Sequence, residues 1–111
     1  MATVSNLVID QGSDFSAIIS LRNQDATPID LTHYTVKSQF RKSYQSSSYK
    51  EFTVTVIDAQ NGKIRLFLSA NTSSDIQPGR YLYDVEITST SGNRRRALEG
   101  LIILTPEITR S

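Results

Sequence analysis

Hydrophobic and polar residues alternate along most of this 111-residue chain, with the period of two that is typical of half-buried β-strands. The alternation predicts strands in the segments 15–21, 34–41, 52–56, 64–68 and 81–87, and two more near 4–9 and 95–104. Polar turn sequences separate them, including Asn61-Gly62 and Ser91-Gly92-Asn93, which supply the positive φ of tight turns. The segment 69–76 is the one helical candidate, and its serines favour one turn at most. About seven short strands at this spacing predict a β-sandwich or barrel.

The stretch that follows Ile76 narrows the fold class. Pro78 and Gly79 precede Tyr81 and Tyr83, an arrangement with which many immunoglobulin-like domains enter their sixth strand. Tyr81 is expected to pack its ring in the core and bond its hydroxyl to the chain upstream, as a tyrosine corner. Tyr83 stands where antibody domains carry a disulfide cysteine, so this is not an antibody-type domain. We therefore predict an all-β, immunoglobulin-like antiparallel β-sandwich of about seven strands, with residues 1–111 forming a single domain.

Composition excludes several classes of function. Twelve basic and eleven acidic residues leave a net charge of +1, without the basic excess of a dedicated nucleic-acid binder. The chain has no cysteine, which excludes disulfides, thiolate metal sites and cysteine nucleophiles. Its longest apolar run, residues 101–104, is too short to cross a membrane, and its first residues lack the features of a secretory signal. We expect a complete, soluble and unprocessed product.

No catalytic or cofactor motif is present in the sequence. Phosphate-binding glycine loops, the nucleophile elbow and His-Glu-x-x-His are all absent. The single histidine, His33, stands outside any cluster of carboxylates at ligand spacing, and metal sites need several converging ligands. The run 94–96 of three arginines is a candidate contact for phosphate or an acidic partner, but a charged hairpin end that guards the next strand is favoured. We expect no enzyme activity, no cofactor and no small-molecule ligand.

Charged residues on the predicted strands favour a structural role. If the sixth strand lies between the third and the seventh, Lys37 and Arg41 would face Asp84 and Glu86 on the outward side of the sheet. Glu99 could join that surface opposite the arginines at 94–96. Exposed pairs of this kind contribute little individually but help to fix the register.

Hydrophobic residues at outward positions suggest a contact surface. Six of them point away from the expected core, and we predict that they form a face buried against another copy or a larger assembly. They are Ile18, Ile57, Phe67, Leu82, Leu101 and Ile103. The serine-rich segment 43–50 also carries Tyr44 and Tyr49, and is either a contact loop or a tolerated surface insertion.

Several short motifs follow one another along the chain. They are Gln11-Gly12-Ser13-Asp14-Phe15, the segment 27–36, Asn61-Gly62-Lys63-Ile64, the segment 78–87, Glu99-Gly100 before an apolar strand, and Ile108-Thr109-Arg110. This layout resembles the immunoglobulin-like modules of tailed-bacteriophage structural proteins, including the amino-terminal domain of siphophage baseplate upper proteins and small structural proteins of cyanophages. The resemblance implies a virion component of the tail, baseplate or neck that acts through contacts. Longer relatives continue into a receptor-binding part, whereas this sequence stops at Ser111.

Three hypotheses of function follow. The first is a tail, baseplate or neck protein, assembled in the host cytoplasm, whose partners are other virion proteins and copies of itself in a symmetric assembly. The second is a capsid decoration protein on the outer shell. The third is a carbohydrate- or host-surface-binding module that uses Tyr44 and Tyr49. We expect no nucleic-acid and no membrane partner.

Overall fold

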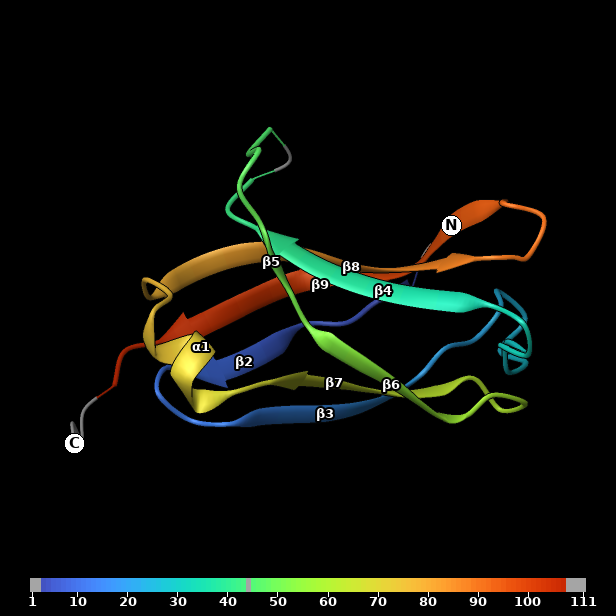
Figure 1. The fold of residues 1–111 in the computed structure, drawn as a ribbon, viewed down its shortest axis with the longest axis horizontal. Coiled ribbons are helices and arrows are strands. Elements are labelled where there is room, and N and C mark those ends of the chain that lie inside the picture. Colours follow the sequence, from blue (N-terminus) through green and yellow to red (C-terminus); the bar gives the residue numbers. More distant parts are fainter. Residues whose placement is uncertain (1–2, 44, 108–111) are drawn as a thin grey trace.

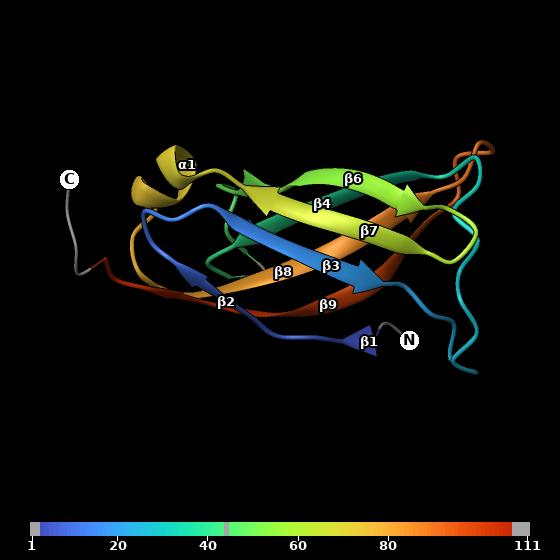
Figure 2. The same ribbon diagram turned by 90° about the horizontal axis from the view of Figure 1, so that it is seen from below.

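Two β-sheets pack face to face in the computed structural model, which describes residues 3–43 and 45–107 (Figures 1 and 2). The larger sheet has the order β1-β9-β8-β4-β5, with β2 also paired to β9, and the smaller sheet has the order β3-β7-β6. The elements are β1 (Thr3–Val4), β2 (Leu7–Asp10), β3 (Phe15–Ser20), β4 (Thr35–Arg41), β5 (Lys50–Glu51), β6 (Thr53–Asp58), β7 (Lys63–Leu68), α1 (Ala70–Ser74), β8 (Gly79–Thr88) and β9 (Arg94–Thr105). The prediction of an all-β sandwich is confirmed.

The strand order is that of an immunoglobulin-like sandwich, apart from its first strand. β8 lies between β4 and β9, as predicted for the sixth strand, and both pairings are antiparallel. The sets β4-β8-β9 and β3-β7-β6 correspond to the two strand sets of immunoglobulin domains. In a constant-type domain the first strand pairs beside the second, whereas here β1 and β2 run parallel to β9 in the other sheet.

Side chains from both sheets form one hydrophobic core, and Phe52 lies where the chain changes sheets. Phe52 is buried between β5 of the larger sheet and β6 of the smaller one, and its N–H donates to the Ser38 carbonyl at 3.0 Å. Its ring centroid lies 5.0 Å from that of Phe40, 5.9 Å from Phe15 and 6.3 Å from Tyr83. This aromatic cluster joins the two layers without a disulfide.

The predicted strand near 4–9 is divided into two short strands at Ser5. The Ser5 N–H donates to the Glu99 carbonyl at 2.8 Å, and its own carbonyl accepts a 2.6 Å bond from the Tyr83 hydroxyl. Gly100 permits this approach, because a Cβ at that position would lie 1.9 Å from the Ser5 carbonyl oxygen. The chain therefore turns toward the core at Ser5 and resumes pairing with β9 at Leu7.

The turn between β2 and β3 is attached to α1, which is slightly longer than the single turn expected. The Asp14 carboxylate accepts a 2.7 Å bond from the Ala70 N–H at the start of the helix. Gln11 donates to the Ile76 carbonyl, and the buried Ser73 hydroxyl accepts from the Gly12 N–H. The motif of residues 11–15 thus holds the helix over one end of the sandwich (Figure 2).

The start of β8 has the contacts expected of a tyrosine corner. The Tyr81 hydroxyl donates to the Gln77 carbonyl, and its ring packs edge-on against Phe40 with the centroids 5.7 Å apart. Gly79 follows Pro78 with a φ of 147°, a backbone conformation that residues with a side chain rarely adopt. A glycine is therefore needed where β8 begins.

Candidate interaction surface

A strip of hydrophobic side chains crosses the outer face of the larger sheet. Leu101 and Ile103 point outward from β9, with 37% and 44% of their surface exposed. Leu82 of β8 lies opposite Leu101 in the register, and Val8 of β2 lies opposite Ile103. Val8 is 61% exposed and Leu82 is half-buried. We call these four residues the apolar strip.

The six outward hydrophobic residues do not form one face, contrary to our prediction. Leu82, Leu101 and Ile103 belong to the larger sheet, whereas the other three belong to the smaller one. The other three are Ile18, Ile57 and Phe67. Ile18 lies opposite Arg65 in the register, and Phe67 lies between Ser16 and Thr53, so this second set is interrupted by polar residues.

Sequence reasoning missed Val8 as a member of the surface. Alternation along 4–9 indicated a strand but gave neither its sheet nor its direction. Only the parallel pairing of β2 with β9 places Val8 beside Ile103. Val4, which is 68% exposed, is positioned opposite Glu99 in the same way.

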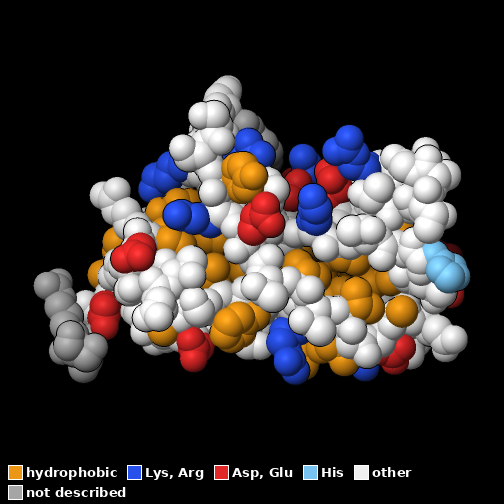
Figure 3. All heavy atoms as spheres, viewed as in Figure 1, with side chains coloured by type: hydrophobic (Ala, Val, Ile, Leu, Met, Phe, Trp, Pro, Cys, Tyr) orange, Lys and Arg blue, Asp and Glu red, His pale blue; other side chains and the backbone are white. Residues whose placement is uncertain are grey.

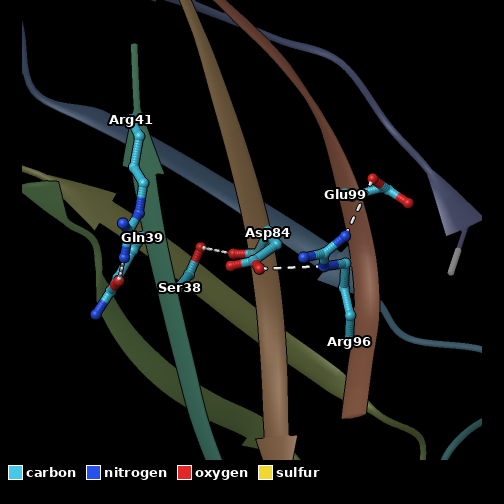
Figure 4. Close-up of polar contacts among 6 residues, drawn as sticks. All are labelled: Ser38, Gln39, Arg41, Asp84, Arg96 and Glu99. Carbon is cyan, nitrogen blue, oxygen red and sulfur yellow. Dashed lines mark hydrogen bonds and ion pairs between the residues drawn. The ribbon is translucent and has the colours of Figure 1, made fainter. Parts of the chain in front are cut away.

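A network of charges lies beside the apolar strip on the same sheet (Figure 4). The Arg96 guanidinium lies 3.2 Å from the Asp84 carboxylate and 3.6 Å from that of Glu99. Glu99 therefore joins this surface as predicted, but it pairs with Arg96 of its own strand and lies opposite Asp84 in the register. Basic and acidic side chains gather along the upper edge of the molecule in Figure 3, over β4 and β8.

Lys37 and Arg41, the two other basic residues predicted on this surface, form no ion pair among the described residues. Lys37 lies opposite Glu86 in the register, but among the described residues it makes no ion pair. Arg41 lies opposite Leu82, and its guanidinium bonds to the Ser46 carbonyl and the Gln39 side chain. The prediction that Arg41 would face Asp84 and Glu86 was therefore wrong by two residues, because the register places Gln39 opposite Asp84.

Burial changes the titration of Asp84. Removal from water raises the pKa of its carboxyl above the ordinary value of 3.8, and nearby Glu86 adds to the rise. The positive charge of Arg96 opposes the rise but does not cancel it. A carboxylate that is largely shielded from water and already paired leaves little free charge at the centre of this surface.

The charged part of the surface is hollowed into a shallow depression of about 260 Å³. Its lining is mostly polar and comes from β4, β8, β9 and Ser43, and it includes Leu82 of the apolar strip. The depression and the strip therefore form one continuous surface, hydrophobic at one end and charged at the other.

The loop between β4 and β5 projects beyond the sandwich (Figure 1). Tyr49 is 47% exposed, and the Arg41 guanidinium lies over its ring at 5.2 Å from the centroid. Tyr44, the other tyrosine predicted as a contact residue, lies outside the described residues, as does the motif 108–110. One face of the Tyr49 ring is thus already in contact with a cation.

The residues that the sequence offered for metal or phosphate binding make local structural contacts in the described part of the chain. His33 is exposed in a turn with a φ of 66°, next to Asp30, whose pKa is lowered by hydrogen bonds from the hydroxyl and N–H of Thr32. Within residues 3–43 and 45–107, no three histidine, cysteine or acidic side chains are grouped to hold a metal. No described helix is both long and apolar enough to span a membrane. Arg95 bonds to the side chain of Asn23, so it joins the hairpin end to a neighbouring loop.

The fold and the surface together define a small β-sandwich module whose most distinctive feature is an exposed face. A family model narrows this class: the model described as the BppU N-terminal domain matches residues 11–92. The chain therefore belongs to this family of phage baseplate upper protein N-terminal domains and is a phage structural module. No curated protein matches the sequence.

Solved structures agree with the fold. The N-terminal domain of phage TP901-1 ORF48 is 15% identical over 90% of this chain and 84% of its own, with a TM-score of 0.54. The GspB Siglec domain is 18% identical over 92% of this chain and 54% of its own, with a TM-score of 0.52. An internalin-like protein of Listeria monocytogenes is 18% identical over 96% of this chain, which spans 28% of that protein, with a TM-score of 0.48. At these identities the likeness of the ORF48 and GspB domains to this chain concerns the fold alone.

Proposed function

We propose that the protein is a non-enzymatic component of a phage tail, baseplate or neck, and that it acts by packing its apolar strip against another virion protein. Membership of the baseplate family indicates a component of the phage particle, and the exposed apolar strip is the observation that supports the proposed contact. Contiguous exposed hydrophobic side chains rimmed by polar groups are typical of protein interfaces. Full burial of each side chain would contribute roughly 1–3 kcal/mol before the costs of association.

The charged end of the surface suits a rim better than a binding pocket. Arg96 bridges Asp84 and Glu99, so its charge is already matched within the chain. A partner that covers the hydrophobic end can leave this network in water at the edge of the contact. Such exposed pairs set orientation and exclude wrong partners more than they add affinity.

A capsid decoration protein would use the same kind of contact but at a different place in the particle. The family favours the baseplate, since that is where the family name places its members. The carbohydrate-binding alternative depends on an aromatic platform, and Arg41 already lies over the Tyr49 ring. Packing against protein is therefore the better-supported function.

Incorporation into particles tests the proposal. Phage particles are assembled in host cells that supply the tagged chain as wild type, as Leu101→Lys/Ile103→Lys, or as Thr55→Lys on the opposite sheet. We expect the double substitution to remove the chain from purified particles and the Thr55 substitution to leave it there. Thermal unfolding of each purified variant checks that it folds. Normal incorporation of a folded double variant would contradict the proposal.

A further inference from the structure

One side of β3 has no strand beside it in the part of the chain that the structure describes. β3 pairs with β7 alone, and the strand that would cover its other side in a constant-type immunoglobulin domain is β1–β2, which lies against β9 instead. Figure 2 shows β3 at the margin of the smaller sheet. A full-length edge is therefore presented by the strand FSAIIS.

Backbone groups at this edge are available for pairing. The Leu21 N–H donates to the Gly62 carbonyl on the β7 side, and hydrogen-bonding direction alternates along a strand. The N–H and C=O groups of Ser16, Ile18 and Ser20 consequently point to the free side. The side chain of Ile18 is 63% exposed on the outer face.

The other sheet edges carry features that discourage pairing, and β3 does not. β1 and β2 are two and four residues long, β5 is only Lys50–Glu51, and β6 has a register irregularity between Val56 and Asp58. Short edge strands, charges and bulges protect natural sheets from joining edge to edge. β3 has six residues, a regular register and no charge or proline.

We propose that β3 is a self-association edge, at which a second copy of this chain adds its own β3 antiparallel about a two-fold axis through Ile18. In that register Ile18 lies opposite the partner's Ile18, and Ser16 lies opposite the partner's Ser20. Each of the three pairs exchanges two backbone bonds, about six in all. The most exposed hydrophobic side chain of the smaller sheet is thereby covered by its own copy, and two three-stranded sheets become one of six strands.

Charge is compatible with a second copy as the occupant. No charged residue lies on β3; across the sheet on β7, Arg65 lies opposite Ile18 and Lys63 lies opposite Ser20. In the paired sheet the two Arg65 side chains would be three strand spacings apart, about 14 Å. This exceeds the Debye length of about 8 Å at physiological salt, so the two like charges barely repel.

This contact is separate from the apolar strip, because the two surfaces belong to different sheets. It does not rest on the function proposed above, and the two proposals can fail independently. Leu101→Lys/Ile103→Lys should leave self-association unchanged, whereas Ile18→Lys should abolish it. Ile18 is mostly exposed, so the lysine should not unfold the chain.

Single cysteines test the register, because the natural sequence has none. Opposed strand residues lie about 5.5 Å apart between Cα atoms, within the reach of a disulfide. Under mild oxidation we expect Ile18→Cys to form a covalent dimer, and the Ser16→Cys/Ser20→Cys double variant to do the same. Ser16→Cys alone is the control, since its two copies would lie about 14 Å apart along the strands, and it should form no covalent dimer.

Sedimentation equilibrium supplies the second measurement. We expect the wild-type mass to rise from one chain to two as concentration increases, and the Ile18→Lys mass to stay at one. A wild type that remains monomeric throughout would overturn the proposal. Cross-linking of Ser16→Cys as fast as Ile18→Cys would also overturn it. So would a wild type that pairs with an added acidic strand peptide but not with a second copy of itself.

Discussion

The Tyr83 hydroxyl donates to the Ser5 carbonyl at 2.6 Å, across 78 positions of sequence. Tyr83 occupies the position where antibody domains carry a disulfide cysteine. Its hydrogen bond holds the N-terminal segment beside β9. β1 and β2 in turn carry Val4 and Val8 on the outer face. A buried tyrosine thus helps to build the apolar strip on the other side of the sheet.

Tyr83→Phe keeps the ring in the aromatic cluster but removes this bond. Loss of a bond that leaves a partly buried carbonyl unsatisfied costs about 1–3 kcal/mol. We expect the free energy of unfolding in urea to fall by that amount, and amide exchange at residues 4–9 to accelerate. Unchanged exchange in that segment would show that the bond does not hold it.

Gly100→Ala places a methyl group where the Ser5 carbonyl now lies. We expect a loss of stability of about 1–3 kcal/mol, typical of overpacking, because the N-terminal segment must move away. Once Ser5 has moved, Tyr83→Phe has no bond left to remove. The double variant should therefore be more stable than the sum of the two single losses predicts, and additive losses would contradict this coupling.

Asp84→Asn should change how stability depends on pH. Because the folded-state pKa of Asp84 is raised, the folded chain binds more protons than the unfolded chain above pH 3.8. The Asp84 contribution therefore falls as the pH rises through the folded-state pKa, and the asparagine variant escapes this loss. Urea unfolding from acid to neutral pH should show the variant gaining on wild type as the pH rises.

The opposite trend, with wild type gaining on the variant, would mean that the ion pair with Arg96 outweighs burial. Arg96→Met serves as the control, since removal of the opposing positive charge should steepen the decline of stability with pH. The exposed Asp25, Asp30 and Asp58 have lowered pKa values and act in the reverse direction, so only differences between variants isolate Asp84.

Ala26→Gly should stabilise the chain. Ala26 has a φ of 70°, a left-handed conformation that costs an L-residue about 1–2 kcal/mol. Glycine relieves this strain but loses more conformational entropy on folding, so we expect a net gain of about 0.5–1 kcal/mol in thermal unfolding. Ala70→Gly at the start of α1 is the control and should be destabilising. A loss of stability in Ala26→Gly would show that the turn is not strained.

Most of the fold could be predicted from the period-two pattern, because one face of nearly every strand is buried. The residues around Tyr81 and Tyr83 also placed β8 between β4 and β9. The pairing of β1 and β2 could not be predicted, since it depends on the contact of Ser5 with Gly100, 95 positions away. Five of the six hydrophobic residues predicted to point outward are exposed and Leu82 is half-buried, but their division between two sheets required the topology.

Arg41 was predicted two residues away from its true position in the register for a related reason. Alternation gives the face of a residue but not the residue opposite it. A register shift of two residues leaves each side chain on the same face, so the pattern does not detect it. Lys37 was correctly set against Glu86, but Arg41 lies opposite Leu82 and bonds to its own loop. The register irregularity between Val85 and Glu86 brings Arg96 to Asp84, and no local sequence signal marks it.

A density map of the assembled phage particle tests the central claim most directly. We predict that Val8, Leu101 and Ile103 lie in van der Waals contact with another virion protein at the tail, baseplate or neck. A map in which this outer face is open to solvent in every copy of the chain would contradict the claim.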